Sequence, residues 1–210
     1  MSVVGTNIPH DSAQGHVAGT SVYIDDMPPM RGELVVDFFY SPIAHGRIRA
    51  LDLSEAANVP GVVGLYTYRD LAYNRLGPIS HDEPLLAEEE LMYIGQPIVV
   101  IAAETPAGVR AAKAAIKLDV EALEPVLTID EAITRGWFLG ETRTFRRGDV
   151  EATLAQSEHV IEGVFVCGGQ DHFYLESQAA IAYPGEHDTI TVHSSTQHPT
   201  EVQGDVAHQL

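Results

Sequence analysis

A continuous apolar run near the middle of the chain is the feature that most limits the fold. Six apolar residues, 98–103, follow Pro97 without a polar interruption. A run that lacks polar alternation is typical of a strand that is buried on both faces. We therefore expect a buried strand here, and a chain of 210 residues is long enough to build a core around it.

The residues after this run predict a helix and a second strand. Thr105 suits the N-cap position, and Pro106 suits the first helical position. Residues 118–123 predict a strand that Pro125 ends. Strand, helix and strand in this order predict a βαβ-like crossover. The apolar positions of the helix recur on one core-facing side: Val109, Ala112 and Ile116.

Shorter patterns predict further elements before the apolar run. Residues 33–40, 47–53 and 62–66 read as strands, although the alternation of the second one slips at Ala50. Ser54 is expected to cap a single helical turn. Pro, Gly and acidic residues predict an exposed loop at 74–83.

The sequence pattern changes after residue 125, where short helices and an irregular link are expected. Thr128 and the Gly148-Asp149 pair are expected to cap two short helices, at 128–134 and 150–157, on either side of an irregular link. Pro199 predicts the start of a final helix. Three further strands are expected, at 159–166, 178–183 and 189–194.

The charge of the chain excludes several classes of partner. Twelve Lys and Arg against thirty Asp and Glu give a formal net charge of −18. Such a balance argues against binding to nucleic acid or to anionic lipid, because both depend on basic side chains. The sequence contains no signal peptide and no apolar stretch of 18 residues, so we expect a cytoplasmic protein without a membrane span.

A glycine pair near residue 168 offers the most distinctive chemistry. Gly168 and Gly169 let the backbone approach a ligand closely, and Gln170 adds a planar amide with a donor and an acceptor. The residues alone leave open an ordinary turn with solvated polar side chains. Asp171 and His172 are adjacent, so on a strand they would point to opposite faces.

The lone cysteine and the histidines have simpler interpretations. Cys167 cannot form an internal disulfide or hold an iron–sulfur cluster, and we expect a buried, inert side chain. His193, His198 and His208 lack the spacing of helical zinc motifs. Exposed or hydrogen-bonded histidines are therefore expected.

Four segments resemble the molybdenum hydroxylases, the family of xanthine dehydrogenases and aldehyde oxidases. Residues 168–176 (GGQDHFYLE) closely resemble a signature of the xanthine dehydrogenases. The other three segments are similar to the entry of the family's hammerhead domain, to the strand and turn after it, and to the approach to the first helix of the molybdenum domain. They are residues 19–28 (GTSVYIDDMP), 41–48 (SPIAHGRI) and 195–203 (STQHPTEVQ).

The resemblance implies an α+β fold in which an α/β hammerhead domain precedes a molybdopterin-binding domain. It divides the chain into an N-terminal arm (1–15), the hammerhead domain (16–125), a linker (126–147) and the incomplete start of the cofactor-binding domain (148–210). The chain ends within a predicted helix, so we expect an N-terminal piece of the molybdopterin-binding large subunit of a xanthine dehydrogenase.

The resemblance also implies an oxidoreductase that converts hypoxanthine to xanthine and then to urate. Electrons would leave molybdenum-molybdopterin through iron–sulfur clusters and FAD to NAD. Gln170, with Gly169, matches the family's cofactor-binding position, where the amide touches a molybdenum ligand without binding the metal. The family's catalytic residues match no position in this chain, so the segment is expected to be inactive alone.

The implied partners are the remainder of the large subunit and an iron–sulfur and FAD subunit, in a hetero-oligomer that takes a purine. The alternatives are a non-catalytic hammerhead interaction module, an aldehyde as the substrate, and an acidic protein that binds a divalent metal through its histidines.

Overall fold

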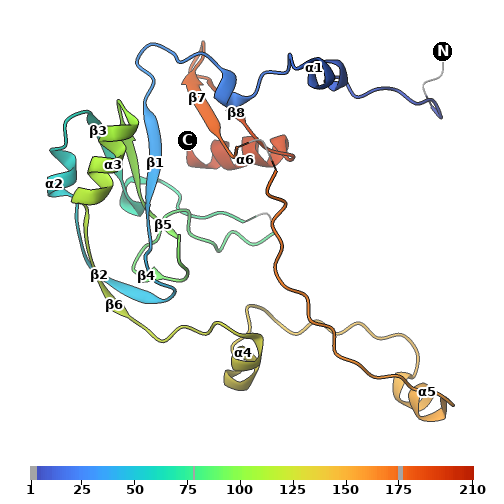
Figure 1. Ribbon diagram of the computed structural model, residues 1–210. Coiled ribbons are helices and arrows are strands. Elements are labelled where there is room, and N and C mark those ends of the chain that lie inside the picture. The colour runs from blue at the N-terminus through green and yellow to red at the C-terminus, as the bar shows by residue number, and fades with distance from the viewer. Residues whose placement is uncertain (1–3, 78, 175–176) are drawn as a thin grey trace. The chain divides into compact units, whose positions relative to one another are not determined.

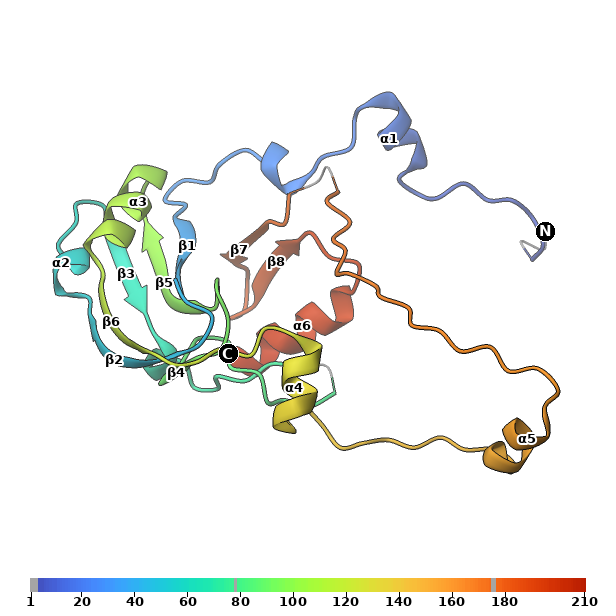
Figure 2. The same cartoon turned by 60° about the horizontal axis from the view of Figure 1, so that its bottom comes forward.

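The computed structural model describes residues 4–77, 79–174 and 177–210 (Figures 1 and 2). Residues 1–3 of the expected arm, Pro78 of the expected loop, and Leu175 and Glu176 of the signature segment lie outside the described residues. Contacts within the chain define two compact units. One contains the chain up to Glu124 together with the C-terminal part, and the other runs from Pro125 to Tyr174.

The buried strand predicted at residues 98–103 is the centre of a sheet in the first unit. Strand β5 (Pro97–Ala103) lies between β1 (Val35–Tyr40) and β3 (Val62–Tyr66), and both pairings are antiparallel. Val35 and Val62 both stand opposite Ala103, so the two edge strands are in register with the same end of β5.

A second sheet of the same unit contains β4 (Glu90–Leu91), β2 (Gly46–Asp52) and β6 (Lys117–Ala122), with β2 in the middle. All pairings in this sheet are antiparallel as well. The register of β2 against β6 shifts between Ile48 and Ala50, where the sequence alternation was expected to slip.

The predicted βαβ crossover is wrong. Strands β5 and β6 belong to different sheets, although helix α3 (Pro106–Ala115) connects them. Both edges of β5 are already paired, with β1 and β3, so no edge is left for a parallel partner. Local sequence predicted the three elements correctly, but the pairing depends on strands far away in the chain.

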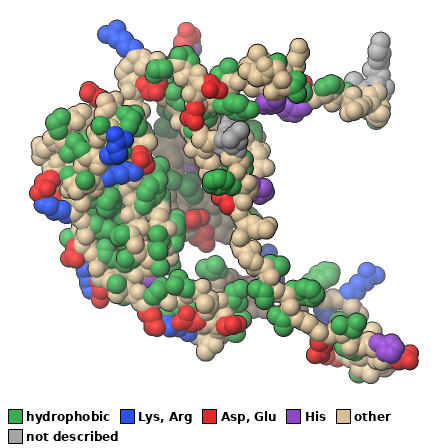
Figure 3. Space-filling model, in the orientation of Figure 1, with side chains coloured by type: hydrophobic (Ala, Val, Ile, Leu, Met, Phe, Trp, Pro, Cys, Tyr) green, Lys and Arg blue, Asp and Glu red, His purple; other side chains and the backbone are tan. Residues whose placement is uncertain are grey.

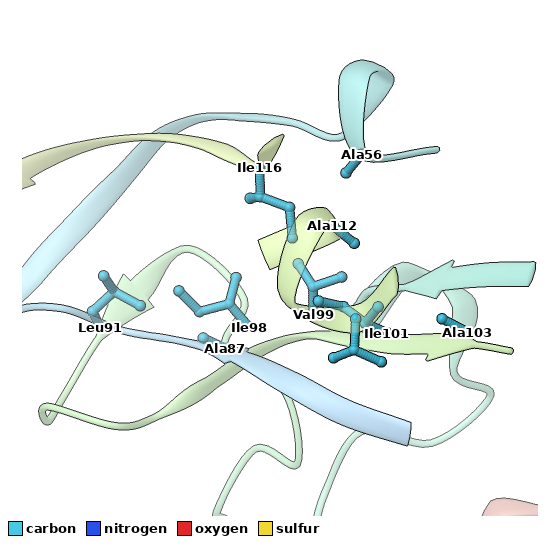
Figure 4. Close-up of a cluster of buried hydrophobic side chains, with 10 residues drawn as sticks. Ala56, Ala87, Leu91, Ile98, Val99, Ile101, Ala103, Ala112 and Ile116 are labelled. Atoms are coloured by element: carbon cyan, nitrogen blue, oxygen red, sulfur yellow. The ribbon is translucent and has the colours of Figure 1, made fainter. Parts of the chain in front are cut away.

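Helix α3 and strand β5 build the core, which Figure 4 shows with its side chains. Thr105 accepts a hydrogen bond from the Gly108 N–H at 3.1 Å, as expected of an N-cap residue. The helical face predicted to point inward is buried, and it meets the buried side chains of β5. These core residues are Ile98, Val99, Ile101, Ala103, Val109, Ala112 and Ile116, with Ala56, Ala87 and Leu91 from neighbouring segments.

Two details before the core differ from expectation. Ser54 is the first residue of α2 (Ser54–Ala57) and not its cap, and the Ser54 N–H donates to the Asp52 carboxylate at 2.9 Å. The loop at 74–83 is exposed only in part, because Asn74 bonds the backbone of the buried Leu86. Leu76 and Glu83 also form an isolated antiparallel bridge.

The C-terminal part of the first unit is a hairpin followed by a helix. Strands β7 (Ala180–Pro184) and β8 (Ile190–Ser194) pair in antiparallel register, and α6 (Pro199–Gln209) begins at Pro199 as predicted. Strand β7 begins two residues later than predicted. The remaining short elements of this unit are α1 (Ala13–Ala18) and the 3-10 turns η1 (Ile24–Asp26) and η2 (Tyr68–Asp70).

The second unit contains two short helices in otherwise irregular chain. Helices α4 (Ile129–Arg135) and α5 (Val150–Gln156) begin with the predicted caps. Thr128 accepts from the Glu131 N–H at 3.2 Å, and Asp149 accepts from the Ala152 N–H at 3.0 Å. No residue of either helix is buried.

The strand predicted at 159–166 does not form. These residues are extended and exposed, and none of the described strands pairs with them. A strand requires a neighbouring backbone to satisfy its N–H and C=O groups, and composition alone cannot supply one. Among the described residues, no helix is long and apolar enough to cross a membrane.

Candidate functional site

The described part of the signature, residues 168–174, lies in the second unit as exposed chain without helix or strand. Residues 158–174 have no helix or strand, and residues 158–173 form no backbone-to-backbone hydrogen bond. Apolar side chains along the segment face solvent, and Figure 3 shows side chains of this type at the surface. Phe165, for example, is 94% exposed.

Gln170 is exposed, and nothing in the described part of the chain hydrogen-bonds to its amide. A Cβ atom built on Gly168 or Gly169 would meet no atom within 4 Å, and neither glycine has a positive φ. The glycines are therefore not required by packing or by backbone conformation within this chain. An uncommitted amide beside an unobstructed backbone is chemically able to meet a group from outside.

The residues after Gln170 form a local turn. The Asp171 carboxylate accepts from the Phe173 N–H at 3.3 Å, and Phe173 has a positive φ of 45°. The rings of His172 and Tyr174 lie 6.4 Å apart. Asp171 is thus used in the turn, and the structure does not bring it together with His172 on a strand.

The histidines are exposed or hydrogen-bonded, as expected. His193 Nε2 lies 2.9 Å from the Tyr183 hydroxyl, and His198 Nδ1 lies 3.4 Å from the Glu201 carboxylate. No group of three or more His, Cys, Asp or Glu side chains able to hold a metal ion occurs among the described residues. The geometry therefore gives no support to the divalent-metal alternative.

The expectation for Cys167 is wrong, because its side chain is exposed. Cys167 follows the strand predicted at 159–166, which does not form, so no sheet is present among the described residues to bury its side chain.

Sequence reasoning missed a cluster of polar contacts around Asn74. The Asn74 amide bonds both the N–H and the C=O of Leu86 at 2.8 Å, and it also donates to Glu88 at 3.1 Å. Arg75 pairs with the Glu88 carboxylate. The hydrogen bonds from Arg75 and then from Asn74 lower the pKa of Glu88 below its usual 4.5. No local pattern signals these contacts, because the partners are a dozen residues apart.

A pocket of about 410 Å³ lies between β8 and α6 in the first unit. Ile190 and Val192 from the strand and Val202 and Val206 from the helix give it apolar walls, and Thr and Gln side chains add polar groups. It contains no histidine, cysteine or acidic residue. Its lining is suited to packing rather than to acid–base chemistry.

Comparison with known proteins decides the family. Residues 18–124 match the family model described as the aldehyde oxidase and xanthine dehydrogenase, a/b hammerhead domain. The chain belongs to this family. Residues 136–210 match the molybdopterin cofactor-binding domain, so the predicted order of a hammerhead domain and the start of a cofactor-binding domain is confirmed.

The names of the relatives refer to different substrates. The chain is 39% identical to xanthine dehydrogenase from Calliphora vicina over 96% of its length, and 36% identical to aldehyde oxidase 1 from Oryctolagus cuniculus over 99%. It spans about 15% of the length of these relatives.

A solved structure of a related enzyme has the same fold. The similarity to quinoline 2-oxidoreductase from Pseudomonas putida 86 has a TM-score of 0.78 at 26% identity, and it covers 98% of this chain and 28% of that one. The chain is thus related to oxidoreductases throughout its length.

Proposed function

We propose that this chain is part of a molybdenum hydroxylase that oxidises a purine, and that it supplies one wall of the molybdenum site. The observation that carries the proposal is Gln170, an exposed amide with no partner in the described chain, within a segment that matches a molybdopterin-binding domain. The cofactor, when bound, supplies the hydroxylation chemistry and takes up the electrons.

The residues present fit a contact that supports the cofactor without binding the metal. A neutral amide donates a hydrogen bond in a fixed plane, and donors of this kind orient and tune the ligands of a metal. Gly168 and Gly169 leave the backbone beside Gln170 uncovered. Gln170 would therefore hold a cofactor ligand in place, with Gly169 allowing the close approach.

The rest of the electron path is proposed to lie outside these residues. The single cysteine cannot hold an iron–sulfur cluster, which takes several cysteine ligands. We assign iron–sulfur clusters, FAD and the route to NAD to other segments or to a partner subunit. The exposed residues 158–174 would serve as the assembly surface toward the rest of the large subunit, because an extended apolar segment gains stability when another polypeptide covers it.

We propose the division of the chain that the family resemblance implies. Residues 1–15 form an arm, 16–125 the hammerhead domain, 126–147 a linker, and 148–210 the beginning of the cofactor-binding domain. In this division the Gln170 segment and the pocket between β8 and α6 both belong to the cofactor-binding part.

A purine is the proposed substrate, supported by the signature at 168–176 and by the xanthine dehydrogenases among the relatives. The similar identity to an aldehyde oxidase favours an aldehyde as the second candidate. The alternative of a non-catalytic interaction module predicts neither activity.

The test is purification of the intact assembly that contains this chain, with molybdenum analysis and assays on xanthine and on an aldehyde. We expect stoichiometric molybdenum and oxidation of xanthine. Gln170→Ala should lower the rate about 10- to 100-fold while molybdenum stays bound, as for other residues that support metal ligands. Gln156→Ala, an exposed glutamine on α5 of the same unit, is the matched control and should change neither quantity.

Each result separates the candidates. An assembly without molybdenum would contradict the proposal and favour the interaction module. Molybdenum with oxidation of the aldehyde only would transfer the assignment to the second candidate. A Gln170→Ala enzyme with unchanged rate would remove the role of this amide but leave the family unaffected.

A further inference from the structure

His45 connects three parts of the hammerhead domain at the point where the chain leaves it. Its carbonyl accepts from the Leu123 N–H at 3.0 Å, just after β6. Its ring Nδ1 lies 2.9 Å from the Glu124 carbonyl oxygen, and its Nε2 lies 2.8 Å from a Glu90 carboxylate oxygen of β4. His45 thus contacts the backbone of each of the last two residues before Pro125, where the second unit begins.

The two ring contacts have an unusual requirement. Both partners of the imidazole, a carbonyl and a carboxylate, are hydrogen-bond acceptors. A neutral imidazole has one N–H, whereas the imidazolium ion has two. Only the protonated ring can therefore donate to Glu124 and to Glu90 at once, and the neutral ring leaves a lone pair facing one of these oxygens.

The groups around His45 also favour the protonated ring on balance. The hydrogen bond to the Glu124 carbonyl, followed by the bond to Glu90, raises the pKa of His45 above its usual 6.5. Partial burial and the positive charge of Arg47 oppose this rise. Arg47 lies 3.7 Å from Glu121 of β6, which offsets part of its effect.

We propose that His45 is a proton-operated clasp that fastens the end of β6 to the start of β2 and to β4 within the hammerhead domain, and that loosens on deprotonation. The inference does not depend on the proposed function, since it concerns contacts within the hammerhead domain. A higher pH removes one ring hydrogen bond, either to Glu124 or to Glu90. The junction at Leu123 and Glu124 then opens more often, while the core around β5 keeps its own contacts.

The sign of the pH effect follows from the raised pKa. The contribution of the clasp is complete below pH 6.5, the value of the unfolded histidine, and it is lost as the pH rises through the higher pKa of the folded state. Loosening is therefore expected on the alkaline side of neutrality and not in acid.

The test is NMR on the 210-residue chain between pH 5.5 and 8.5. The ring proton of His45 gives its titration, and hydrogen exchange gives the protection of the Leu123 amide after correction for the intrinsic pH dependence. We expect a His45 midpoint above 6.5 and a fall of about two- to tenfold in Leu123 protection across it, the effect of losing one hydrogen bond.

Three variants make the result specific. His45→Gln should abolish the pH-dependent step in Leu123 protection. Glu90→Gln should keep the fold but move the His45 midpoint to lower pH, together with the step. His159→Gln, at an exposed histidine of the second unit, is the matched control and should behave as the wild type.

Three outcomes would overturn the clasp. Leu123 protection could stay constant across the titration of His45, or the step could persist in His45→Gln. In the third, β5 amides would lose protection in parallel, which would indicate global unfolding rather than a local opening. If His45→Gln does not fold, the shift in Glu90→Gln alone decides.

Discussion

Ile101 shows how much of the stability rests on single residues of β5. It is fully buried and stands between Asp37 of β1 and Leu65 of β3. Ile101→Ala should lower the free energy of unfolding by about 2–5 kcal/mol, because it removes buried methyl groups and leaves a cavity. Urea unfolding of the chain measures this loss.

Val36 supplies the matched control for Ile101. It lies on β1 but is 56% exposed. Val36→Ala should change the free energy of unfolding by only about 0.5 kcal/mol or less. Equal losses in the two variants would mean that the core is not where the buried side chains place it.

The ion pair of Asp37 and Lys113 predicts that the folded chain loses stability at acidic pH. Burial raises the pKa of Asp37, but hydrogen bonds from Lys113 at 2.6 Å and from the Phe38 N–H at 2.7 Å lower it, and the net result is a pKa below 3.8. The stabilising contribution is therefore complete above pH 3.8 and is lost as the pH falls through the lower folded value.

Asp37→Asn is the variant that tests this dependence. Near neutral pH it should be less stable than the wild type, and the difference should shrink as the pH falls below 3.8. Urea unfolding at a series of pH values measures it, with Glu158→Gln at an exposed position as the control. A difference that stays constant into acid would show that the carboxylate charge contributes nothing.

Structural roles that depend on neighbouring residues in the sequence could be predicted, and roles that depend on the fold of a longer segment could not. The cap at Thr105 and the buried face of α3 follow from the spacing of neighbouring residues. Gln96 is almost fully buried, yet nothing in the sequence around it suggests this. Its amide oxygen accepts from the Met92 N–H at 2.7 Å, a contact that depends on the path of the whole loop.

At the scale of elements, the sequence predicts what forms more reliably than what pairs. The sequence pattern located β5 and β3, but the neighbours of β5 include a strand far away in the chain, β1. Residues 159–166 have the composition of a strand and lack a partner. Gln170 shares this limit, because the motif singles out the amide while no described residue hydrogen-bonds to it.

The N-cap residues of α3 and α4 lead to different predictions for stability, because only α3 has buried residues. Thr105→Ala in front of α3 should cost about 1 kcal/mol of unfolding free energy, because one N–H at the helix start loses its partner. Helix α3 is packed on the core, so this loss should be visible in global urea unfolding.

Thr128→Ala in front of α4 is the matched comparison. It removes the same type of bond from a helix with no buried residue. We expect chemical shifts of α4 to report less helix, while the urea transition of the first unit stays unchanged. A shift of that transition would show that α4 contributes to the core.

At the scale of the whole molecule, the distribution of apolar surface is uneven. The first unit has a buried core, while residues 158–174 expose apolar side chains, among them Ile161, Val164, Phe165 and Val166. The chain spans about 15% of the length of the xanthine dehydrogenase relative.

A substitution at Phe165 tests whether the exposed apolar side chains of residues 158–174 cause the chain to associate. An exposed apolar run without proline tends to pair with other chains, so the isolated chain should associate as its concentration rises. Phe165→Lys should weaken that association without changing the urea transition, because the 94% exposed ring contributes no core contact. Phe39→Lys, at a residue packed against the core, should instead lower the transition. Sedimentation over a range of concentrations, together with urea unfolding, measures both effects. If Phe165→Lys destabilised the first unit as Phe39→Lys does, the segment would belong to the core and could not be an assembly surface.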